Sequence, residues 1–346
     1  MEDYPLADDL NHIMAHTQGL WDELAGQRLF ITGGTGFFGC WLLESFLWAN
    51  DHLGLSARAT VLTRSPGAFR IKAPHLANHP AIELEEGDVR TFAYPPGEFR
   101  YLIHAATDAS ARLNQAQPAL MLDTIIEGTR HTLDFARQCG AKKFLLTSSG
   151  AVYGKQPPAL THIPEDYPGG PDPLDPGSAY GEGKRAAELL CAIYSQAYGL
   201  ETKIARCFAF VGPYLPLDAH FAIGNFIRDA LQGGPIHVNG DGTPYRSYLY
   251  AADLAIWLWT ILLKAPSGRP YNVGSDQALT ISELAQKVKD ILLPDGSIIT
   301  ARQAKEGQPA ARYVPAIQRA EEELGMKSWI SLPEAIRKTR DWSSNR

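Results

Sequence analysis

A glycine-rich turn between an apolar stretch and an amphipathic one is the feature that most constrains this chain of 346 residues. Residues 28–32 are mostly apolar and β-prone, and residues 41–47 space their apolar side chains as a helix does. Gly33, Gly36 and Gly39 lie between them. In a strand–turn–helix unit, the first glycine permits the tight turn, the second lets the backbone approach a pyrophosphate, and the third lets the helix pack on the strand. The pattern therefore predicts a dinucleotide-binding turn, with a ligand-free glycine turn as the alternative.

Apolar stretches and helical patterns alternate after this turn. Strands are predicted at residues 59–63, 101–104, 143–147 and 203–205, with helices near 118–139 and 179–198 between them. Such alternation predicts an α/β fold built on a Rossmann-type, doubly wound parallel sheet. After residue 212 the pattern is less regular, with helices near 221–232, 251–264 and 281–292.

These changes in pattern suggest how the chain is divided. We expect a helical N-terminal extension at 1–26, a dinucleotide-binding domain at 27–212 with a return segment near 247–274, and a smaller C-terminal α/β substrate-binding lobe at 213–346. Residues 8–24 space their apolar side chains along one helical face, which we expect to dock on the sheet domain. Residues 155–176 contain seven prolines and predict a stiff irregular loop.

Composition and charge exclude several function classes. The chain has 32 Lys and Arg against 38 Asp and Glu, a net charge of -6, and no basic run, so nucleic acid is not an expected partner. The longest apolar run, 254–263, is shorter than the roughly 20 residues that span a bilayer, so we expect a buried helix and no membrane partner. The acidic N-terminus does not resemble a secretory signal, which favours the cytoplasm.

Cysteine and histidine spacing predicts neither a disulfide framework nor a metal site. The four cysteines are scattered without CxxC spacing, as expected of small buried residues. The pairs His12 and His16, and His75 and His79, have helical spacing but no acidic third ligand at a suitable interval. We therefore expect no metal.

Tyr180 and Lys184 form a candidate acid/base pair. Residues four apart share one face of a helix, so the phenol and the ammonium point the same way. A nearby cation favours the phenolate form of tyrosine, which makes the phenol useful for moving a carbinol proton. A tyrosine followed by a lysine on a wet helix gives the same spacing, so this pair needs supporting signals.

Ser149 supplies such a signal. It follows a predicted strand, at the sheet edge where doubly wound folds bind ligands. Its hydroxyl can donate to the substrate oxygen that Tyr180 protonates or deprotonates. Ordinary loop chemistry of serine is the alternative.

Two residues bear on which dinucleotide binds. The second predicted strand ends at Arg64 and not at the acid that usually meets a free 2′-hydroxyl, so a 2′-phosphate and hence NADP is favoured over NAD. Asp88 follows a further predicted strand, between those at 59–63 and 101–104. It is placed to accept a hydrogen bond from an adenine amino group, with turn capping as the alternative. A solvated surface arginine is the alternative for Arg64.

Taken together, these motifs resemble the extended short-chain dehydrogenase/reductases, specifically the nucleotide-sugar epimerase/dehydratase group. The resemblance covers nearly the whole chain and rests on ordered matches at 32–39, 87–89, 104–106, 128–129, 148–154, 180–184, 212–213, 240–242, Arg246 with Asp253, and 271–274. So many ordered matches are specific to the family, though not to one reaction. The resemblance implies a homodimer that pairs the helices near 118–139 and 179–198, although the same apolar residues also suit packing on the sheet.

The resemblance also implies roles for single residues. Ser149, Tyr180 and Lys184 match the catalytic triad, and Lys184 would also hold the nicotinamide ribose. The implied dinucleotide contacts are Gly33, Gly36, Phe37, Phe38, Gly39, Arg64, Asp88, Val89, Ala105, Ala106, Tyr180 and Lys184. The implied contacts to a nucleotide-diphosphate sugar are Thr107, Ser149, Asn225, Arg246 and, more weakly matched, Arg312.

The informative departure from the family lies directly after Ser149. Dehydratases carry two acids at the positions of Gly150 and Ala151, and decarboxylases of UDP-glucuronate keep a glutamate there. Neither residue of this chain can transfer a proton, so the pattern is nearer to the 4-epimerases. A second departure is Ala209-Phe210, where many relatives have an asparagine before Gly-Pro, which leaves the sugar contacts open.

Several functions follow from this pattern. We expect an NAD(P)-dependent 4-epimerase acting through a transient 4-keto sugar, with Tyr180 as acid/base. The alternative, favoured by Arg64, is an NADPH-dependent reductase of a 4-keto sugar nucleotide. Dehydratase and decarboxylase rank below these. A dinucleotide-binding sensor ranks last, because it would not need Ser149, Tyr180 and Lys184 together.

Overall fold

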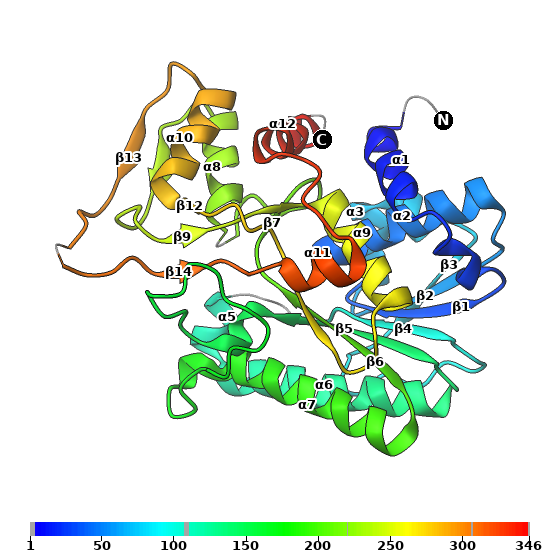
Figure 1. Cartoon of the computed structure of the whole chain (residues 1–346). Coiled ribbons are helices and arrows are strands. Elements are labelled where there is room, and N and C mark those ends of the chain that lie inside the picture. The colour runs from blue at the N-terminus through cyan, green and yellow to red at the C-terminus, as the bar shows by residue number, and fades with distance from the viewer. Residues whose placement is uncertain (1–3, 107–110, 220, 306, 345–346) are drawn as a thin grey trace. The chain divides into compact units, whose positions relative to one another are not determined.

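The computed structural model describes residues 4–106, 111–219, 221–305 and 307–344. The chain forms two compact units, each made of separate segments. Unit 1 contains residues 1–152, 170–206 and 255–271, and unit 2 contains residues 153–169, 207–254 and 272–346. Figure 1 labels the elements of both units.

A seven-stranded sheet forms the centre of unit 1, in the order β11-β6-β5-β4-β1-β2-β3. Its strands are β1 (Arg28–Thr32), β2 (Arg58–Thr63), β3 (Ile82–Glu86), β4 (Tyr101–His104), β5 (Lys143–Ser149), β6 (Glu201–Cys207) and β11 (Pro270–Val273). The pairs β1–β2, β1–β4, β2–β3 and β4–β5 are parallel. The predicted α/β fold with a doubly wound sheet is confirmed.

The winding of the sheet reverses at β1. The strands β2 and β3 lie on one side of β1, and β4, β5 and β6 lie on the other. Thr32 and His104 are neighbours where β1 and β4 end. Open parallel sheets bind ligands outside the carboxyl ends of their strands at such a reversal, so the fold places a ligand site here.

Helices cover both faces of this sheet (Figure 1). They are α1 (Ala7–His16), α2 (Phe37–Leu53), α3 (Pro66–Lys72), α4 (Pro74–Ala77), α5 (Ala111–Ala116), α6 (Pro118–Gln138), α7 (Ala179–Tyr198) and α9 (Ala251–Lys264), with short 3-10 turns at Trp21–Leu24, Gly150–Tyr153 and Pro176–Ser178. The long helices α6 and α7 run side by side on one face, and α2 and α9 lie on the other.

A cluster of phenylalanines fills the space between the sheet and α6. Phe30 on β1 packs against Phe92, Phe99 and Phe135, and its ring centre lies 4.8 Å from that of Phe135 in an edge-to-face pair. All four side chains are buried. Burial of each such side chain contributes about 1.5–3 kcal/mol, so this cluster fixes how α6 sits on the sheet.

The apolar run at 254–263 is a buried helix, as predicted. It forms most of α9, and its residues are at most 6% exposed from Leu254 to Leu263. No helix among the described residues is long and apolar enough to cross a membrane.

The N-terminal extension differs from its prediction in one respect. Residues 8–24 do not form a single helix, because α1 ends at His16 and a 3-10 turn begins at Trp21. Gly19, between them, has φ +72°, a left-handed conformation that breaks a helix. The segment still docks on the sheet domain, since Trp21 packs against Trp259 of α9 with ring centres 5.1 Å apart.

Unit 2 carries small sheets and its own helices. The sheets join β12-β9-β14, β10-β7 and β13-β8. Their elements and the helices are β7 (Phe210–Val211), α8 (Ala222–Leu231), β8 (Ile236–Val238), β9 (Tyr245–Arg246), β10 (Leu249–Tyr250), β12 (Leu279–Thr280), α10 (Ile281–Leu292), β13 (Ile298–Thr300), β14 (Arg312–Tyr313), α11 (Gln318–Leu324) and α12 (Leu332–Ser344). The helix α10 packs on α8 and α12, and it begins with a capping box of Thr280 and Glu283.

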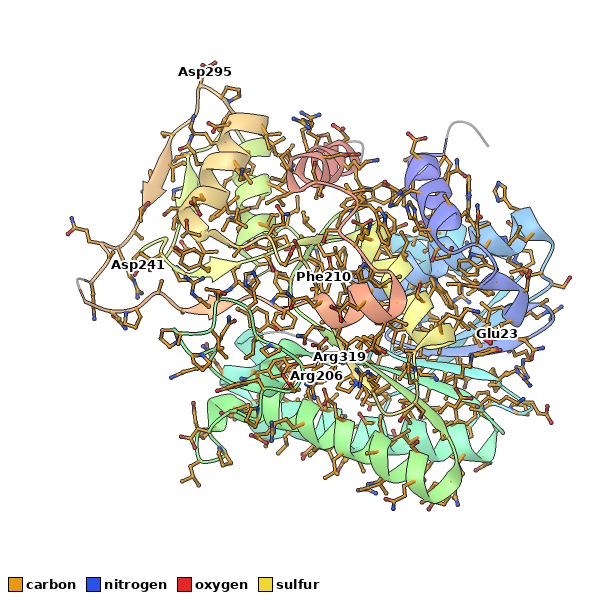
Figure 2. The ribbon with its side chains drawn as sticks, viewed as in Figure 1. Glu23, Arg206, Phe210, Asp241, Asp295 and Arg319 are labelled. Carbon is orange, nitrogen blue, oxygen red and sulfur yellow. The ribbon has the colours of Figure 1, made fainter. Side chains whose placement is uncertain are left out.

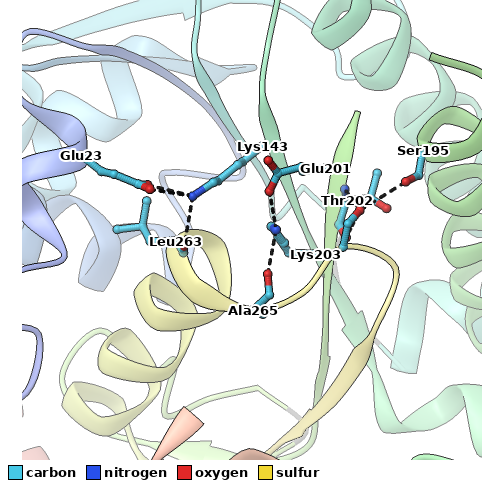
Figure 3. Close-up of polar contacts among 9 residues, drawn as sticks. Glu23, Lys143, Ser195, Glu201, Thr202, Lys203, Leu263 and Ala265 are labelled. Carbon is cyan, nitrogen blue, oxygen red and sulfur yellow. Dashed lines mark hydrogen bonds and ion pairs between the residues drawn. The ribbon is translucent and has the colours of Figure 1, made fainter. Parts of the chain in front are cut away.

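Two lysines hold the end of α9 in unit 1 (Figure 3). The Nζ of Lys143 donates to the carbonyl of Leu263 at 2.7 Å, and the Nζ of Lys203 donates to the carbonyl of Ala265 at 2.7 Å. The last carbonyls of a helix lack intrahelical donors and carry partial negative charge, so an ammonium there is stabilising. Each lysine also pairs with a partly exposed carboxylate, that of Glu23 or Glu201.

Replacing Lys203 should therefore weaken unit 1. We expect Lys203→Met to lower the free energy of unfolding by about 2 kcal/mol, because a buried ammonium at a helix end is lost while Glu201 remains solvated. Urea unfolding followed by circular dichroism measures this. The exposed Lys142 is the matched control, and equal losses in Lys142→Met and Lys203→Met would show that the contact with α9 contributes nothing.

Candidate functional site

The glycine turn after β1 is shaped by two very close approaches. Gly33 has φ +72°, and a Cβ built there would lie 2.4 Å from the carbonyl carbon of Ala105. A Cβ on Gly39 would lie 2.3 Å from the Cα of Gly34. No side chain fits at either position, so the turn packs directly on the backbone after β4, and α2 packs directly on the turn.

Gly36 is different, because its surface is open. A Cβ there would meet only the carbonyl oxygen of Gly33, at 3.4 Å. Gly36 is exposed and is the N-cap of α2, and no side chain caps this end of the helix. The first-turn amides, which include those of Phe37 and Phe38, carry the partial positive charge that a phosphate group prefers. The turn therefore fits the pyrophosphate of a dinucleotide.

Arg64 and Asp88 lie beyond the ends of β2 and β3. Arg64 is exposed. Asp88 is held by Arg90, whose Nε and Nη2 donate to the two carboxylate oxygens at 2.9 and 3.0 Å. This hydrogen bonding lowers the pKa of Asp88 to about 2, and the charge of Arg64 acts in the same direction. Asp88 thus stays anionic at any ordinary pH, and its proposed contact with adenine remains a prediction.

His104 ties the end of β4 to its surroundings. Its Nδ1 lies 2.8 Å from the Oγ1 of Thr32, and its Nε2 lies 3.1 Å from the Oγ1 of Thr129. The amide of Ala106 donates to the same Thr32 hydroxyl at 3.2 Å. Burial, with a smaller effect from the charge of Lys184, lowers the pKa of His104 to about 3, so the ring is a neutral hydrogen-bonding link. The backbone at 105 and 106 is thereby fixed, while Thr107 lies outside the described residues.

Tyr180 and Lys184 share the first turns of α7, as their spacing predicts. The Nζ of Lys184 lies 5.9 Å from the centre of the Tyr180 ring. Lys184 is 3% exposed, and its Nζ donates to the carbonyl of Thr147 at 2.8 Å. The backbone amide of Tyr180 donates to the Oδ1 of Asn114 at 3.0 Å. One hydrogen bond thus holds the Lys184 ammonium and another holds the backbone of Tyr180. Together they keep the buried ammonium close to the phenol.

Ser149 ends β5 on the same edge of the sheet. Its Oγ accepts a hydrogen bond from the amide of Ala151 at 3.2 Å, which orients the hydroxyl. Thr147, which binds Lys184, lies two residues earlier on this strand and donates to the carbonyl of His104 at 3.2 Å. The structure thus brings Ser149, Tyr180 and Lys184 to the carboxyl edge of the sheet in unit 1.

A buried ion pair next to these residues was not predicted from the sequence. Glu188 lies one turn after Lys184, accepts a hydrogen bond from Ser148 at 2.5 Å, and pairs with Arg206 at 2.7 Å. Both charged side chains are about seven-eighths buried, and Figure 2 labels Arg206. The spacing of Glu188 from Lys184 is the one signal that could have revealed this link. It fixes Ser148, and so the end of β5, against α7.

The predicted substrate residues of unit 2 partly come together. Arg246 and Arg312 lie on the adjacent parallel strands β9 and β14. The guanidinium of Arg312 stacks 4.0 Å from the ring centre of Tyr245, and that of Arg246 lies 5.8 Å from the ring centre of Tyr313. Asn225 lies on α8, where its Oδ1 accepts from Arg228 at 3.3 Å. In this register Arg312 shares a face of the strand pair with Tyr245, and Arg246 shares the other face with Tyr313, so the two guanidinium groups do not form one site. Each is, by itself, a group of the kind that binds phosphate.

The two histidine pairs with helical spacing make local contacts. The Nδ1 of His16 lies 2.9 Å from the carbonyl of His12, and the Nε2 of His75 lies 2.8 Å from Glu44. His79 lies near a surface carboxylate. Within the described ranges, no group of three or more His, Cys, Asp or Glu side chains could hold a metal ion.

Comparison with known proteins agrees with this geometry. A model of the NAD dependent epimerase/dehydratase family matches residues 29–274. UDP-glucuronic acid decarboxylase 6 of Arabidopsis thaliana is 32% identical over 312 residues, which are 90% of this chain and 87% of that protein. The chain belongs to the NAD-dependent epimerase/dehydratase family.

Solved structures share the fold of this family member. A UDP-glucose 4-epimerase from Thermotoga maritima, solved with UDP-glucose, has a TM-score of 0.77 at 21% identity and covers 92% of this chain and 99% of its own. A dTDP-glucose 4,6-dehydratase from Streptomyces venezuelae, solved with NAD, has a TM-score of 0.78 at 24% identity over 92% and 98% of the two chains. The family resemblance expected from the sequence is confirmed, and the family is NAD-dependent, while the preference for NADP that Arg64 suggested is not shown.

Gly36, which has open space around it, and Gly39, which has none, together give a sharp test of the turn. Gly36→Ala should weaken NAD binding by about 1–3 kcal/mol, because its methyl group projects into the space for the pyrophosphate. The free energy of unfolding of this variant should differ from that of the parent by under about 1 kcal/mol, because φ at residue 36 is -81° and the space around it is open. Calorimetric titration and thermal unfolding measure the two quantities.

Gly39→Ala is the contrasting variant. Its Cβ has no room against the backbone of Gly34, so the protein itself should lose stability, by at least about 1–3 kcal/mol. If Gly36→Ala bound NAD as tightly as the parent, this turn would not be the pyrophosphate site.

Proposed function

We propose that the chain is an NAD-dependent enzyme acting at C4 of a nucleotide-diphosphate sugar, and specifically a 4-epimerase. The observation that carries this is the side-chain chemistry around Ser149. Tyr180 and the buried Lys184 lie together on α7, and Lys184 is bound to Thr147 on the strand that ends at Ser149. Gly150 and Ala151 follow Ser149 at the positions where an elimination would need acids. The enzyme is thus equipped to move a proton at one oxygen and not at the neighbouring carbons.

The chain's own residues supply the acid/base part of this reaction. A dinucleotide held at the glycine turn would supply reversible hydride transfer at C4, and return of the hydride to the opposite face of the 4-keto sugar would invert that carbon. Tyr180, as phenolate beside the Lys184 ammonium, takes the proton of the C4 hydroxyl and later gives it back. Ser149 donates a hydrogen bond to the same oxygen and orients it.

Arg246 of unit 2 supports the proposed substrate class, because its planar guanidinium can bind a phosphate oxygen of a nucleotide diphosphate in a bidentate manner. Arg312 lies on the opposite face of the strand pair and is the weaker candidate for this contact. Asn225 is the proposed amide contact to the same diphosphate. Recognition of the diphosphate leaves the sugar and the base to other contacts.

Decarboxylation of UDP-glucuronic acid is the second candidate. The relatives that carry this name are 32% identical over 90% of the chain, which favours it more than the sequence pattern alone did. Its chemistry also tolerates the missing acid better than dehydration does. A 4-keto uronate is a β-keto acid and loses carbon dioxide without a base at C5, whereas dehydration needs both a base at C5 and an acid at C6.

Reduction of a 4-keto sugar nucleotide by NADPH is the third. It rests on Arg64, whose exposed guanidinium follows β2 where a 2′-phosphate would lie. A reductase would consume its cofactor, whereas an epimerase regenerates it.

Product analysis separates these reactions. The purified protein would be given NAD with UDP-glucose, UDP-galactose or UDP-glucuronic acid, and the products followed by NMR. We expect interconversion of the first two without net change in cofactor. Tyr180→Phe should lower the rate by at least about a hundredfold while NAD still binds, because only the proton acceptor is lost.

Other products would decide against epimerisation. Release of carbon dioxide with a UDP-pentose would favour the decarboxylase, and net oxidation of NADPH by a 4-keto sugar nucleotide would favour the reductase. Bound dinucleotide without turnover of any of these sugars would leave a binding role. Undiminished activity in Tyr180→Phe would remove Tyr180 from the mechanism.

We also propose that the enzyme is a homodimer paired through α6 and α7. Leu133 and Leu190 face the interior and are 0% and 6% exposed. Leu189 and Ile193, four residues apart on α7, are 62% and 47% exposed, so they form an apolar stripe on the outside of the helix. A second copy of the same face could cover this stripe symmetrically.

Charge introduced into the stripe should separate the copies. We expect Leu189→Asp combined with Ile193→Asp to give a folded monomer, measured by light scattering during gel filtration. Leu174→Asp, at an apolar loop residue that is 90% exposed, is the control and should stay dimeric. A parent protein that is already monomeric would refute the proposal.

A further inference from the structure

Lys72 makes a contact that neither the family motifs nor the sequence patterns point to. It is the last residue of α3, and its Nζ donates to the carbonyl oxygen of Thr35 at 2.7 Å. Thr35 lies inside the glycine turn, directly before Gly36. The ammonium of an exposed lysine is thus held at the turn from an element 37 residues away in sequence.

The surroundings of this ammonium suit a phosphate group. An ammonium has three N–H donors, and Thr35 takes one of them. Gly36 is exposed and has open space where a side chain would be, and the amides at the start of the 17-residue helix α2 follow it. A cation beside such an opening strengthens an anion site through charge-assisted hydrogen bonds.

A second cation lies at the other end of the same segment. Arg64 follows β2, Ser65 caps α3 by accepting from the amide of Ala68 at 3.4 Å, and Lys72 ends the helix. The short helix therefore lies between the two cationic residues. Asp88, the carboxylate on which Arg64 acts, is already paired with Arg90.

We propose that Lys72 is a dinucleotide-binding residue whose ammonium, positioned by the Thr35 carbonyl, donates to a phosphate oxygen of the bound cofactor. The proposal rests on the dinucleotide site assigned above to the glycine turn. The phosphate belongs either to the pyrophosphate bridge, which NAD and NADP share, or to the 2′-phosphate, which only NADP carries. The contact itself is the same charge-assisted hydrogen bond in both cases.

Calorimetric titration with NAD and with NADP tests this on nucleotide-free protein, without any sugar substrate. Lys72→Met should weaken binding by about tenfold or more, the value expected for loss of a hydrogen bond to a charged group. Arg70→Met is the matched control, because Arg70 is an exposed cation on the same helix, and it should stay within about twofold of the parent. Weaker binding of both nucleotides assigns Lys72 to the pyrophosphate, and weaker binding of NADP alone assigns it to the 2′-phosphate.

Lys72→Gln separates phosphate binding from a purely structural tether. Its amide can still donate to the Thr35 carbonyl but carries no charge, so a tether would let it bind like the parent, whereas our proposal expects it to bind as weakly as Lys72→Met. Parent-like affinity of Lys72→Met or Lys72→Gln for both nucleotides would overturn the proposal. If the parent bound neither nucleotide, the cofactor site and the proposed function would fail with it, whereas a silent Lys72 variant of a binding-competent parent refutes this inference alone.

Discussion

The backbone contact between Gly33 and the segment after β4 underlies the candidate site. A side chain on residue 33 would overlap Ala105, so this turn after β1 requires a glycine at position 33. That turn leads into α2, whose first-turn amides follow the exposed Gly36. His104 holds the other partner of the contact, since its ring is hydrogen-bonded on both nitrogens. The strand ends beside β1, where the winding of the sheet reverses, therefore form a defined surface for a ligand.

The second dependence is the attachment of α7 to β5. Thr147 binds Lys184, and Ser148 binds Glu188, so the two residues before Ser149 are each tied to α7. Close packing continues after it, because a Cβ on Gly181 would lie 2.8 Å from the carbonyl oxygen of Ala151. A hydroxyl on a strand and a phenol on a helix are thereby held in register by their neighbours. Of the buried charges that do this, Glu188 is paired with Arg206, and the Lys184 ammonium is hydrogen-bonded to the carbonyl of Thr147, which lowers the cost of burying each charge.

Local signals in the sequence predicted most of the fold. Short apolar runs before glycines and helical spacing after them reflect burial on a sheet, and burial is what β1, α2, α7 and α9 experience. The single N-terminal helix was wrong because apolar spacing does not register a left-handed residue such as Gly19. The candidate acid/base pair was visible because Tyr180 and Lys184 are neighbours along one helix. By contrast, the links from Glu188 to Arg206 and from Lys72 to Thr35 join residues 18 and 37 positions apart, and no periodicity marks them. The pairing of Asp88 with Arg90 is local and could have been anticipated.

The segmented composition of unit 1 has a consequence for how the protein is made. Its sheet ends with β11, and its second face is covered by α9, yet both come after a long stretch that belongs to unit 2. During translation, β6 leaves the ribosome more than 60 residues before β11, so one edge of the nascent sheet stays unpaired meanwhile. The ammonium groups of Lys143 and Lys203 likewise await the carbonyls at the end of α9. Such an open edge can pair with other chains, so the nascent protein is most exposed to aggregation and most in need of chaperones over this interval.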